Sequence, residues 1–142
     1  MSREVKFRVW NKVEKRYRRI VRLNYDDGEL VSITVYDPDD FAPTILPLER
    51  VILEQSTGLK DKNGEEIYDG DIVKCYSRRK LIGEYQVIWN EDCGGFECES
   101  LKPLVDGGDR MLRDIRVFNE ISIQFRVIGN IHENPELLGG EE

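Results

Sequence analysis

The stretch TGLKDKNGEEIYDGDIVK, residues 57–74, alternates charged residues with glycine and then ends in an apolar run. Its Asn63-Gly64 pair is typical of a tight turn, in which both residues tolerate positive φ. In the following YDGDIVKC, Gly70 is expected to take the strained backbone position of a second turn, with Asp69 and Asp71 bonding nearby N–H groups. The stretch therefore predicts two turns that position a hairpin and feed a strand.

Two kinds of ligand site compete with this interpretation. Asp61, Asn63 and Glu65 have the spacing that begins a calcium loop, but such a loop needs glycine at its sixth position and glutamate at its twelfth. Here Gly64 is fourth and Ile72 is twelfth. The glycines are followed by neither a Lys-Ser/Thr pair nor a helix start, so no phosphate loop is predicted either. The stretch is therefore assigned to structure and not to a site.

The sequence on both sides of this stretch has the pattern of short strands. Residues 5–10 and 30–36 alternate between apolar and polar side chains, as half-buried strands do. Residues 16–25 also fit helical spacing, but their composition favours strands that lead into a hairpin turn with Gly28 at positive φ. Further strands are predicted at residues 72–76, 84–90, 95–101 and 121–131. The fold is therefore expected to be mainly β, with a small barrel in the C-terminal part.

A few short helices are expected as well. Residues 111–120 have weak helical spacing, residues 44–56 read as a short helix or an irregular strand, and Asn134 is placed to cap a helix beginning at Pro135 and ending at Gly139. The loop at residues 37–43 separates two regions. We expect an N-terminal basic β lobe over residues 1–45 and a barrel domain over residues 46–142.

Composition restricts the class of protein. The chain has 142 residues, no apolar run near the roughly 20 residues that cross a bilayer, and no apolar signal-peptide core at its start. Cys75, Cys93 and Cys98 are an odd number of cysteines, which fits a reducing compartment. We therefore expect a cytoplasmic protein with no membrane partner.

Charge is distributed unevenly along the chain. Residues 1–22 contain nine Lys or Arg and two acids, whereas the other 120 residues contain 12 basic and 26 acidic side chains. The net charges are therefore +7 and −14. The basic segment either attracts an external polyanion or folds against acidic surface of its own or a neighbouring copy. The low pI, near 4.9, favours the second interpretation.

The basic segment also interleaves cations with aromatic side chains, as surfaces that stack on single-stranded nucleic acid do. If it is one strand, three of its arginines share a face, an arrangement that equally protects an edge strand from aggregation. The candidate partner-binding residues are Arg16, Arg18, Arg22, Trp10 and Tyr17.

Other chemistries have little support. A zinc site would need Cys75, Cys93, Cys98 and His132 to converge from distant segments, whereas buried cysteines usually act as small apolar residues. His132 lies alone beside a turn, and the acids of residues 37–40 are more typical of a solvated loop than of a magnesium site. No catalytic residue, metal or cofactor is predicted.

Three passages resemble the YopX-like proteins of bacteriophages and prophages. They are REVKFRVWNK at the N-terminus, STGLKDKNGEEIYDGDIVK in the middle and VIGNIHENPELL near the end, in the family's order and relative positions. The resemblance implies an SH3-like barrel in the C-terminal part and a role in phage propagation or lysogeny inside the host cytoplasm. It implies no reaction, so the matching residues of the central passage are regarded as structural.

These observations favour a non-enzymatic protein-binding or regulatory module that associates with itself. The alternatives are a nucleic-acid-binding protein that uses the basic N-terminal face, which the net charge disfavours, and a metal-dependent phage enzyme.

Overall fold

The structure, a computed structural model, describes residues 5–92, 94–101, 111–113 and 123–138. The chain forms two compact units, an N-terminal unit of residues 5–55 and a C-terminal unit whose described part begins at Ser56. The sequence led us to expect this boundary after residue 45. The structure divides the chain later, because β5 (Thr44–Pro47) and the first half of β6 (Val51–Lys60) pair with strands of the N-terminal unit.

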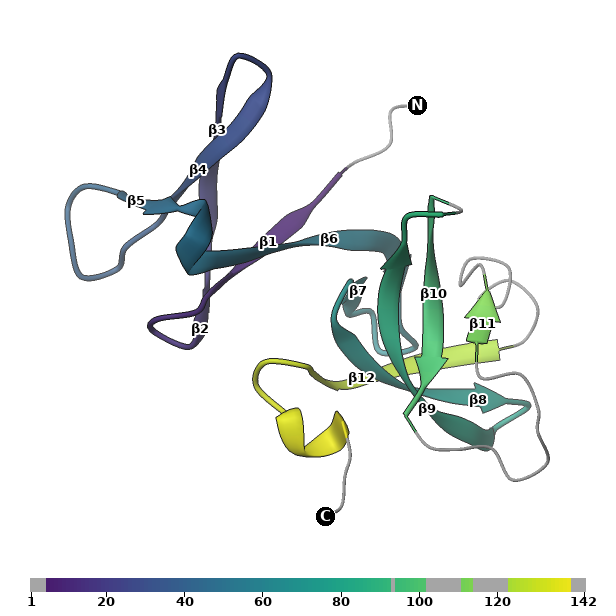
Figure 1. Ribbon diagram of the computed structural model, residues 1–142. Coiled ribbons are helices and arrows are strands. Elements are labelled where there is room, and N and C mark those ends of the chain that lie inside the picture. The colour runs from purple at the N-terminus through teal and green to yellow at the C-terminus, as the bar shows by residue number, and fades with distance from the viewer. Residues whose placement is uncertain (1–4, 93, 102–110, 114–122, 139–142) are drawn as a thin grey trace. The chain divides into compact units, whose positions relative to one another are not determined.

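The prediction of a mainly β chain is confirmed (Figure 1). Met111–Arg113, where helical spacing was expected, pairs as a strand with Glu97–Glu99, and residues 114–120 lie outside the described residues. The short helices of the described chain are single 3₁₀ turns. In addition to β5 and β6, the described chain contains the following elements: β1 (Phe7–Asn11), β2 (Arg16–Arg18), β3 (Ile20–Asp26), β4 (Glu29–Val35), η1 (Leu48–Arg50), β7 (Glu66–Tyr68), β8 (Asp71–Ser77), β9 (Lys80–Asn90), β10 (Gly95–Ser100), β11 (Met111–Arg113), β12 (Ile123–Asn130) and η2 (Pro135–Leu138).

The N-terminal unit contains two small antiparallel sheets. In one, β1 lies between β2 and the first half of β6, and in the other β4 lies between β3 and β5. The β3–β4 turn has Asp27 at φ 51° and Gly28 at φ 81°, which confirms the predicted hairpin. Alternate residues of these strands pack together as one apolar core, formed by Val9, Ile33, Val35, Leu46 and Val51.

The C-terminal unit contains a curled five-stranded antiparallel sheet in the order β11-β10-β9-β8-β12. The four strands predicted from turn-bounded apolar segments correspond to β8, β9, β10 and β12. Their inward-facing residues, together with Ile67 of β7, form a second core that contains Val73, Val87 and Phe125. The sequence predicted a small barrel for this part of the chain, and the structure has a curled half-barrel sheet there.

Asp61 explains why the first turn of residues 57–74 is so densely polar. Its carboxylate is almost fully buried and accepts hydrogen bonds from the backbone N–H groups of Asn63 and Glu65 through Oδ1. Oδ2 accepts a third, at 2.9 Å, from the N–H of Val127 in β12. Gly64 has φ 85°, whereas Asn63, which was also expected at positive φ, does not. The turn therefore fastens the strand β12, which lies 66 residues further along the chain.

Gly70 forms the second turn as predicted. Its φ of 92° lies in the left-handed region, its N–H donates to the carbonyl of Val87, and its own carbonyl accepts from Ile131. Asp71 accepts from the N–H of Tyr68 at 2.8 Å. The two turns thus connect β7, β9 and the end of β12, which confirms the structural interpretation of the stretch.

Cys75 and Cys98 are fully buried in the C-terminal core as free thiols. Burial raises the pKa of Cys75 from 9.0 to about 12 and raises the pKa of Cys98 further. Cys93 lies outside the described residues. The prediction that Cys75 and Cys98 act as small apolar strand residues is confirmed.

No helix among the described residues is long and apolar enough to cross a membrane.

Candidate functional site

The first sheet of the N-terminal unit is held by a buried glutamate. Glu54 of β6 is 3% exposed, and its Oε1 accepts hydrogen bonds of 2.8 Å from Arg8 of β1 and from the hydroxyl of Tyr17 of β2. The Arg8 guanidinium also lies 4.5 Å from the centre of the Tyr17 ring, and Trp10 packs its ring edge-on against Tyr17. The buried carboxylate is thus paired and hydrogen-bonded by side chains of two neighbouring strands, as its desolvation requires.

The turn between β1 and β2 is held by Asn11 and Glu14. Asn11 Oδ1 accepts from the N–H groups of Val13 and Glu14, and its amide donates to the Glu14 carboxylate at 2.8 Å. Arg18 donates to both oxygens of Glu14, at 2.9 and 2.8 Å. This bidentate ion pair lowers the pKa of Glu14 from 4.5 to about 2 and raises the pKa of Arg18.

The loop of residues 37–43 is fastened to the same network through Asp37. Its carboxylate accepts from the N–H of Asp39 and from the hydroxyl of Thr44, and one oxygen lies 3.9 Å from Arg18. The Asp39 bond, with that of Thr44, lowers the pKa of Asp37. Asp37, which the sequence offered as part of a solvated acidic loop, therefore fixes where the loop leaves β4 and enters β5.

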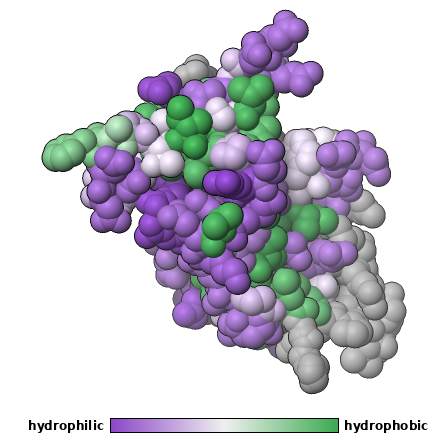
Figure 2. All heavy atoms as spheres, turned by 60° about the vertical axis from the view of Figure 1, so that its left-hand side comes forward, coloured by the Kyte–Doolittle hydropathy of each residue, from purple (hydrophilic) through white to green (hydrophobic). Residues whose placement is uncertain are grey.

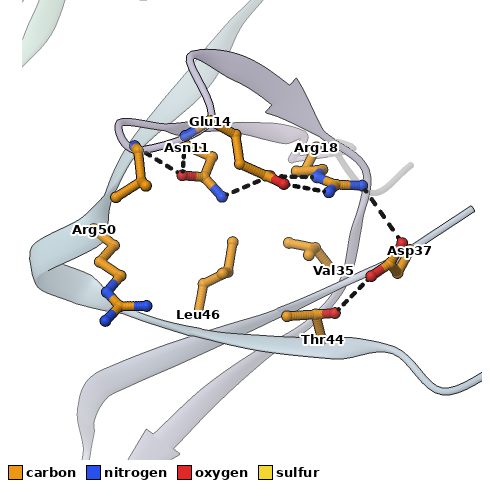
Figure 3. A pocket seen from close by; sticks show the side chains of 9 residues that line it. Asn11, Glu14, Arg18, Val35, Asp37, Thr44, Leu46 and Arg50 are labelled. Atoms are coloured by element: carbon orange, nitrogen blue, oxygen red, sulfur yellow. Dashed lines mark hydrogen bonds and ion pairs between the residues drawn. The ribbon is translucent and has the colours of Figure 1, made fainter. Parts of the chain in front are cut away.

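A cavity of about 210 Å³ lies beside this network. Buried Val35 and Leu46 line it between strands, and the chain Asn11, Glu14, Arg18, Asp37 borders it (Figure 3). Arg50, at the end of the cavity opposite Asp37, makes no ion pair with any described residue (Figure 3). Since pockets for drug-sized ligands measure roughly 300–1,000 Å³, this cavity has room for a single side chain.

The loop that borders the cavity carries a fully exposed aromatic ring. Phe41 is as accessible as in an extended chain, at 109%, and it is preceded by the exposed acids Asp39 and Asp40. Hydrophobic side chains elsewhere interrupt a mostly hydrophilic surface as separate small patches (Figure 2).

The five predicted partner-binding residues are not brought together as a free surface. Trp10 is buried, Tyr17 is hydrogen-bonded to Glu54, and Arg18 is 10% exposed and paired with Glu14. Arg16 pairs with Glu14 at 3.3 Å while remaining half exposed. The expectation that Arg16, Arg18 and Arg22 share one strand face is wrong for Arg22, because the chain leaves β2 at Arg19 and Arg22 lies on β3 in the other sheet.

Charge is balanced within the N-terminal unit. Residues 5–55 contain nine basic and nine acidic side chains, whereas residues 56–142 contain 11 basic and 18 acidic ones. The basic segment is therefore offset by acids of its own unit, among them Glu54 and Asp37. The net charge of −14 that residues 23–142 carry is therefore divided between the two units.

Sequence reasoning missed three features of this region. Leu46 and Arg50 lie in a segment read as a helix or irregular strand, so their convergence on one cavity depends on the pairing of β4 with β5. Phe41 is the third, because the aspartates beside it dominate the local sequence pattern of the loop. The signal that could have found it is a single aromatic residue between Asp40 and Pro43 in a loop that is otherwise polar.

The residues considered for metal chemistry are scattered. No group of three or more His, Cys, Asp or Glu side chains gathers within the part of the chain that the structure describes. His132 donates its backbone N–H to Asn130 in the turn before η2, and Asn134 Oδ1 accepts from the N–H of Asn130. The Asn134 side chain thus holds the end of β12.

Comparisons with known proteins agree with the architecture. A family model described as YopX protein matches residues 6–139. A solved structure described as protein EF1440 from Enterococcus faecalis is similar at a TM-score of 0.62 and 29% identity, over 97% of this chain and 100% of that one. A search of the curated proteins finds no match.

Proposed function

The chain is a member of the YopX family, and from this premise we propose that it is a non-enzymatic protein-binding module whose N-terminal unit binds a second copy of the same chain. In the proposed dimer, Phe41 of one copy enters the cavity beside Leu46 and Val35 of the other. The exchange is reciprocal, so that one two-fold axis gives two identical contacts. The protein acts in the cytoplasm of a bacterial host that carries the phage or prophage.

The observation that carries the proposal is the combination of a fully exposed Phe with a side-chain-sized cavity in the same unit, which has Val13, Val35 and Leu46 in its lining. In the proposed dimer each supplies an apolar contact that the other lacks in the monomer. A large aromatic ring gains about 2 kcal/mol or more when it leaves water for an apolar pocket.

Charge complementarity selects a second copy as the occupant. Asp39 and Asp40 precede Phe41 on the incoming loop, and Arg50, which pairs with no described residue, lines the cavity. Docking the ring would bring these acids toward that guanidinium, since they directly precede Phe41 and Arg50 lies at the cavity it enters. The two carboxylates on the other side, Glu14 and Asp37, are offset by the guanidinium groups of Arg16 and Arg18 and so repel an acidic loop less.

Two loop contacts bury less surface than the roughly 1,200 Å² of a permanent interface, so association is expected to be weak and reversible. Sedimentation velocity over about 1 μM to 1 mM covers that range of affinity. We expect the wild type to shift from monomer to dimer, and Phe41→Ser to stay monomeric with an unchanged melting temperature. Tyr25→Ser removes another exposed aromatic ring of the same unit and is expected to dimerise normally. A wild type that is monomeric throughout, or a Phe41→Ser protein that dimerises, would contradict the proposal.

A further inference from the structure

The tip of the β8–β9 hairpin has an unusual backbone. Ser77 pairs with Lys80, which leaves a two-residue loop of Arg78 at φ 52° and Arg79 at φ 69°. Two successive positive φ values define a type I′ turn, for which Asn-Gly is the favoured sequence. Side chains with a β-carbon adopt this region only against strain. The chain therefore keeps two arginines where a neutral pair would fit the turn better.

The same hairpin gathers further cations. Arg126 of β12 lies directly opposite Lys74 of β8 in the sheet, and Lys80 follows the turn. Like charges placed opposite each other destabilise a sheet. Glu84 lies on the other side of Lys74, yet none of these basic side chains makes an ion pair with a described residue.

The cations of this cluster differ from those of the basic N-terminal segment in whether acids pair with them. There, Arg8, Arg16 and Arg18 are neutralised by acids of their own unit. Here, five cations that pair with no described residue belong to a unit that is acidic overall, namely Lys74, Arg78, Arg79, Lys80 and Arg126. Three lie at the hairpin tip and two on the adjoining face of β8 and β12, and such a concentration of positive charge attracts a polyanion.

We propose that the tip of the β8–β9 hairpin, together with the adjoining face of β8 and β12, binds double-stranded DNA. In this proposal Lys74, Arg78, Arg79, Lys80 and Arg126 contact phosphates. Contacts of this kind hold the duplex without reading its sequence.

Duplex DNA fits this surface better than a single strand does. Single-stranded nucleic acid is held mainly by stacking on open aromatic faces. Near the hairpin tip the aromatic residue is Tyr76, and the ammonium group of Lys62 lies 4.6 Å from its ring centre, so that face is already occupied. Of the hairpin's other aromatic side chains, Tyr85 is buried and Trp89 lies at the far end of β9, packed against Phe96. Since the rest of the unit is acidic, contact is confined to this surface and should depend strongly on salt.

The decisive variant is Arg78→Asn combined with Arg79→Gly. It removes two phosphate contacts and installs the favoured turn sequence, so the melting temperature should not fall. The matched control, Arg19→Gln with Arg22→Gln, removes the same charge from two exposed, unpaired arginines of the N-terminal unit.

Binding of the full-length proteins to a fluorescent 20-base-pair duplex is measured by anisotropy at about 50 and 200 mM salt. With five phosphate contacts the wild type should lose roughly 500-fold in affinity between these concentrations, and the variant with three contacts roughly 40-fold. At the lower salt the variant should bind about tenfold more weakly or worse, and the control like the wild type.

The proposal is overturned if the hairpin variant keeps wild-type affinity and salt dependence, or if the control loses as much as the variant. It is also overturned if the wild type binds phosphatidylserine-containing vesicles but not the duplex, because the cations would then serve an anionic membrane.

Discussion

Replacing Asp61 with Ala should strongly destabilise the C-terminal unit. The buried carboxylate accepts three backbone hydrogen bonds, and the free-energy cost of losing each one depends on whether water can replace the acceptor. Asn63 and Glu65 are exposed, so water can replace the acceptor at a cost of about 0.5–1.5 kcal/mol each. The Val127 N–H lies within the fold and loses a charged acceptor, which costs about 1.5–3 kcal/mol. We therefore expect a loss of about 4 kcal/mol in the free energy of unfolding.

Asp61→Asn separates the two parts of this cost. Its carbonyl oxygen still accepts from the two N–H groups of the turn, whereas its amide group faces the Val127 N–H without accepting from it. The expected loss is about 2 kcal/mol, which is the cost of the Val127 bond alone.

Urea unfolding should be followed through the fluorescence of Trp89, which reports on the C-terminal unit, in a Trp10→Phe background so that it is the sole tryptophan. Asp92→Ala, in an exposed turn, is the control and should lie within about 0.5 kcal/mol of the parent protein. If Asp61→Ala unfolds like Asp92→Ala, the residue does not fasten β12 and the account of the turn is wrong.

Three further predictions concern both units. Gly70→Val should lower the stability of the C-terminal unit by about 1–3 kcal/mol, because Val is strained at a φ of 92°; an unchanged unfolding midpoint would contradict the assigned turn. The ion pair of Glu14 lowers its pKa from 4.5 to about 2, so the stability it contributes is complete above pH 4.5 and is lost as the pH falls toward 2. Trp10 fluorescence should therefore show a steeper acid destabilisation of the N-terminal unit in the wild type than in Glu14→Gln, and equal slopes would refute the pairing. Cys75 and Cys98, whose pKa values are raised by burial, should resist iodoacetamide in the folded protein at pH 8 and react only on unfolding, which mass spectrometry can follow at each position.

The strands were predictable because their side chains alternate and their ends are marked by turn residues. Gly28 and Gly70 showed where the chain needs positive φ, and both positions have it. Local pattern also identified residues 57–74 as structural, since the acids there miss the spacing of a calcium loop.

Long-range pairing was beyond local pattern. The bond from Val127 to Asp61 joins segments far apart in sequence, and nothing near either residue indicates it. The boundary between the units was placed too early because β6 runs through it as one strand. The Arg78-Arg79 turn was invisible because arginine carries no turn signal, so its geometry follows only from the pairing of β8 with β9.

Long-range contacts also decide which charges of the candidate site are neutralised, and the sequence does not show them. A run of basic residues indicates an excess of charge, but whether that charge is free depends on which acids the fold brings near. Glu54 reaches Arg8 across 46 residues, and Asp37 approaches Arg18 from the far end of β4. Among the described residues, Arg50 and the basic side chains of the β8–β9 hairpin are examples of cations that make no ion pair.

A charge-swap measured by sedimentation velocity tests reciprocal docking most directly. Arg50→Glu alone should weaken dimerisation, and Asp39→Lys with Asp40→Lys should weaken it too, because each leaves like charges facing across the contact. The protein carrying all three substitutions restores opposite charges at both contacts. The account predicts that this triple variant dimerises close to wild-type affinity, and a triple variant as monomeric as either parent would contradict it.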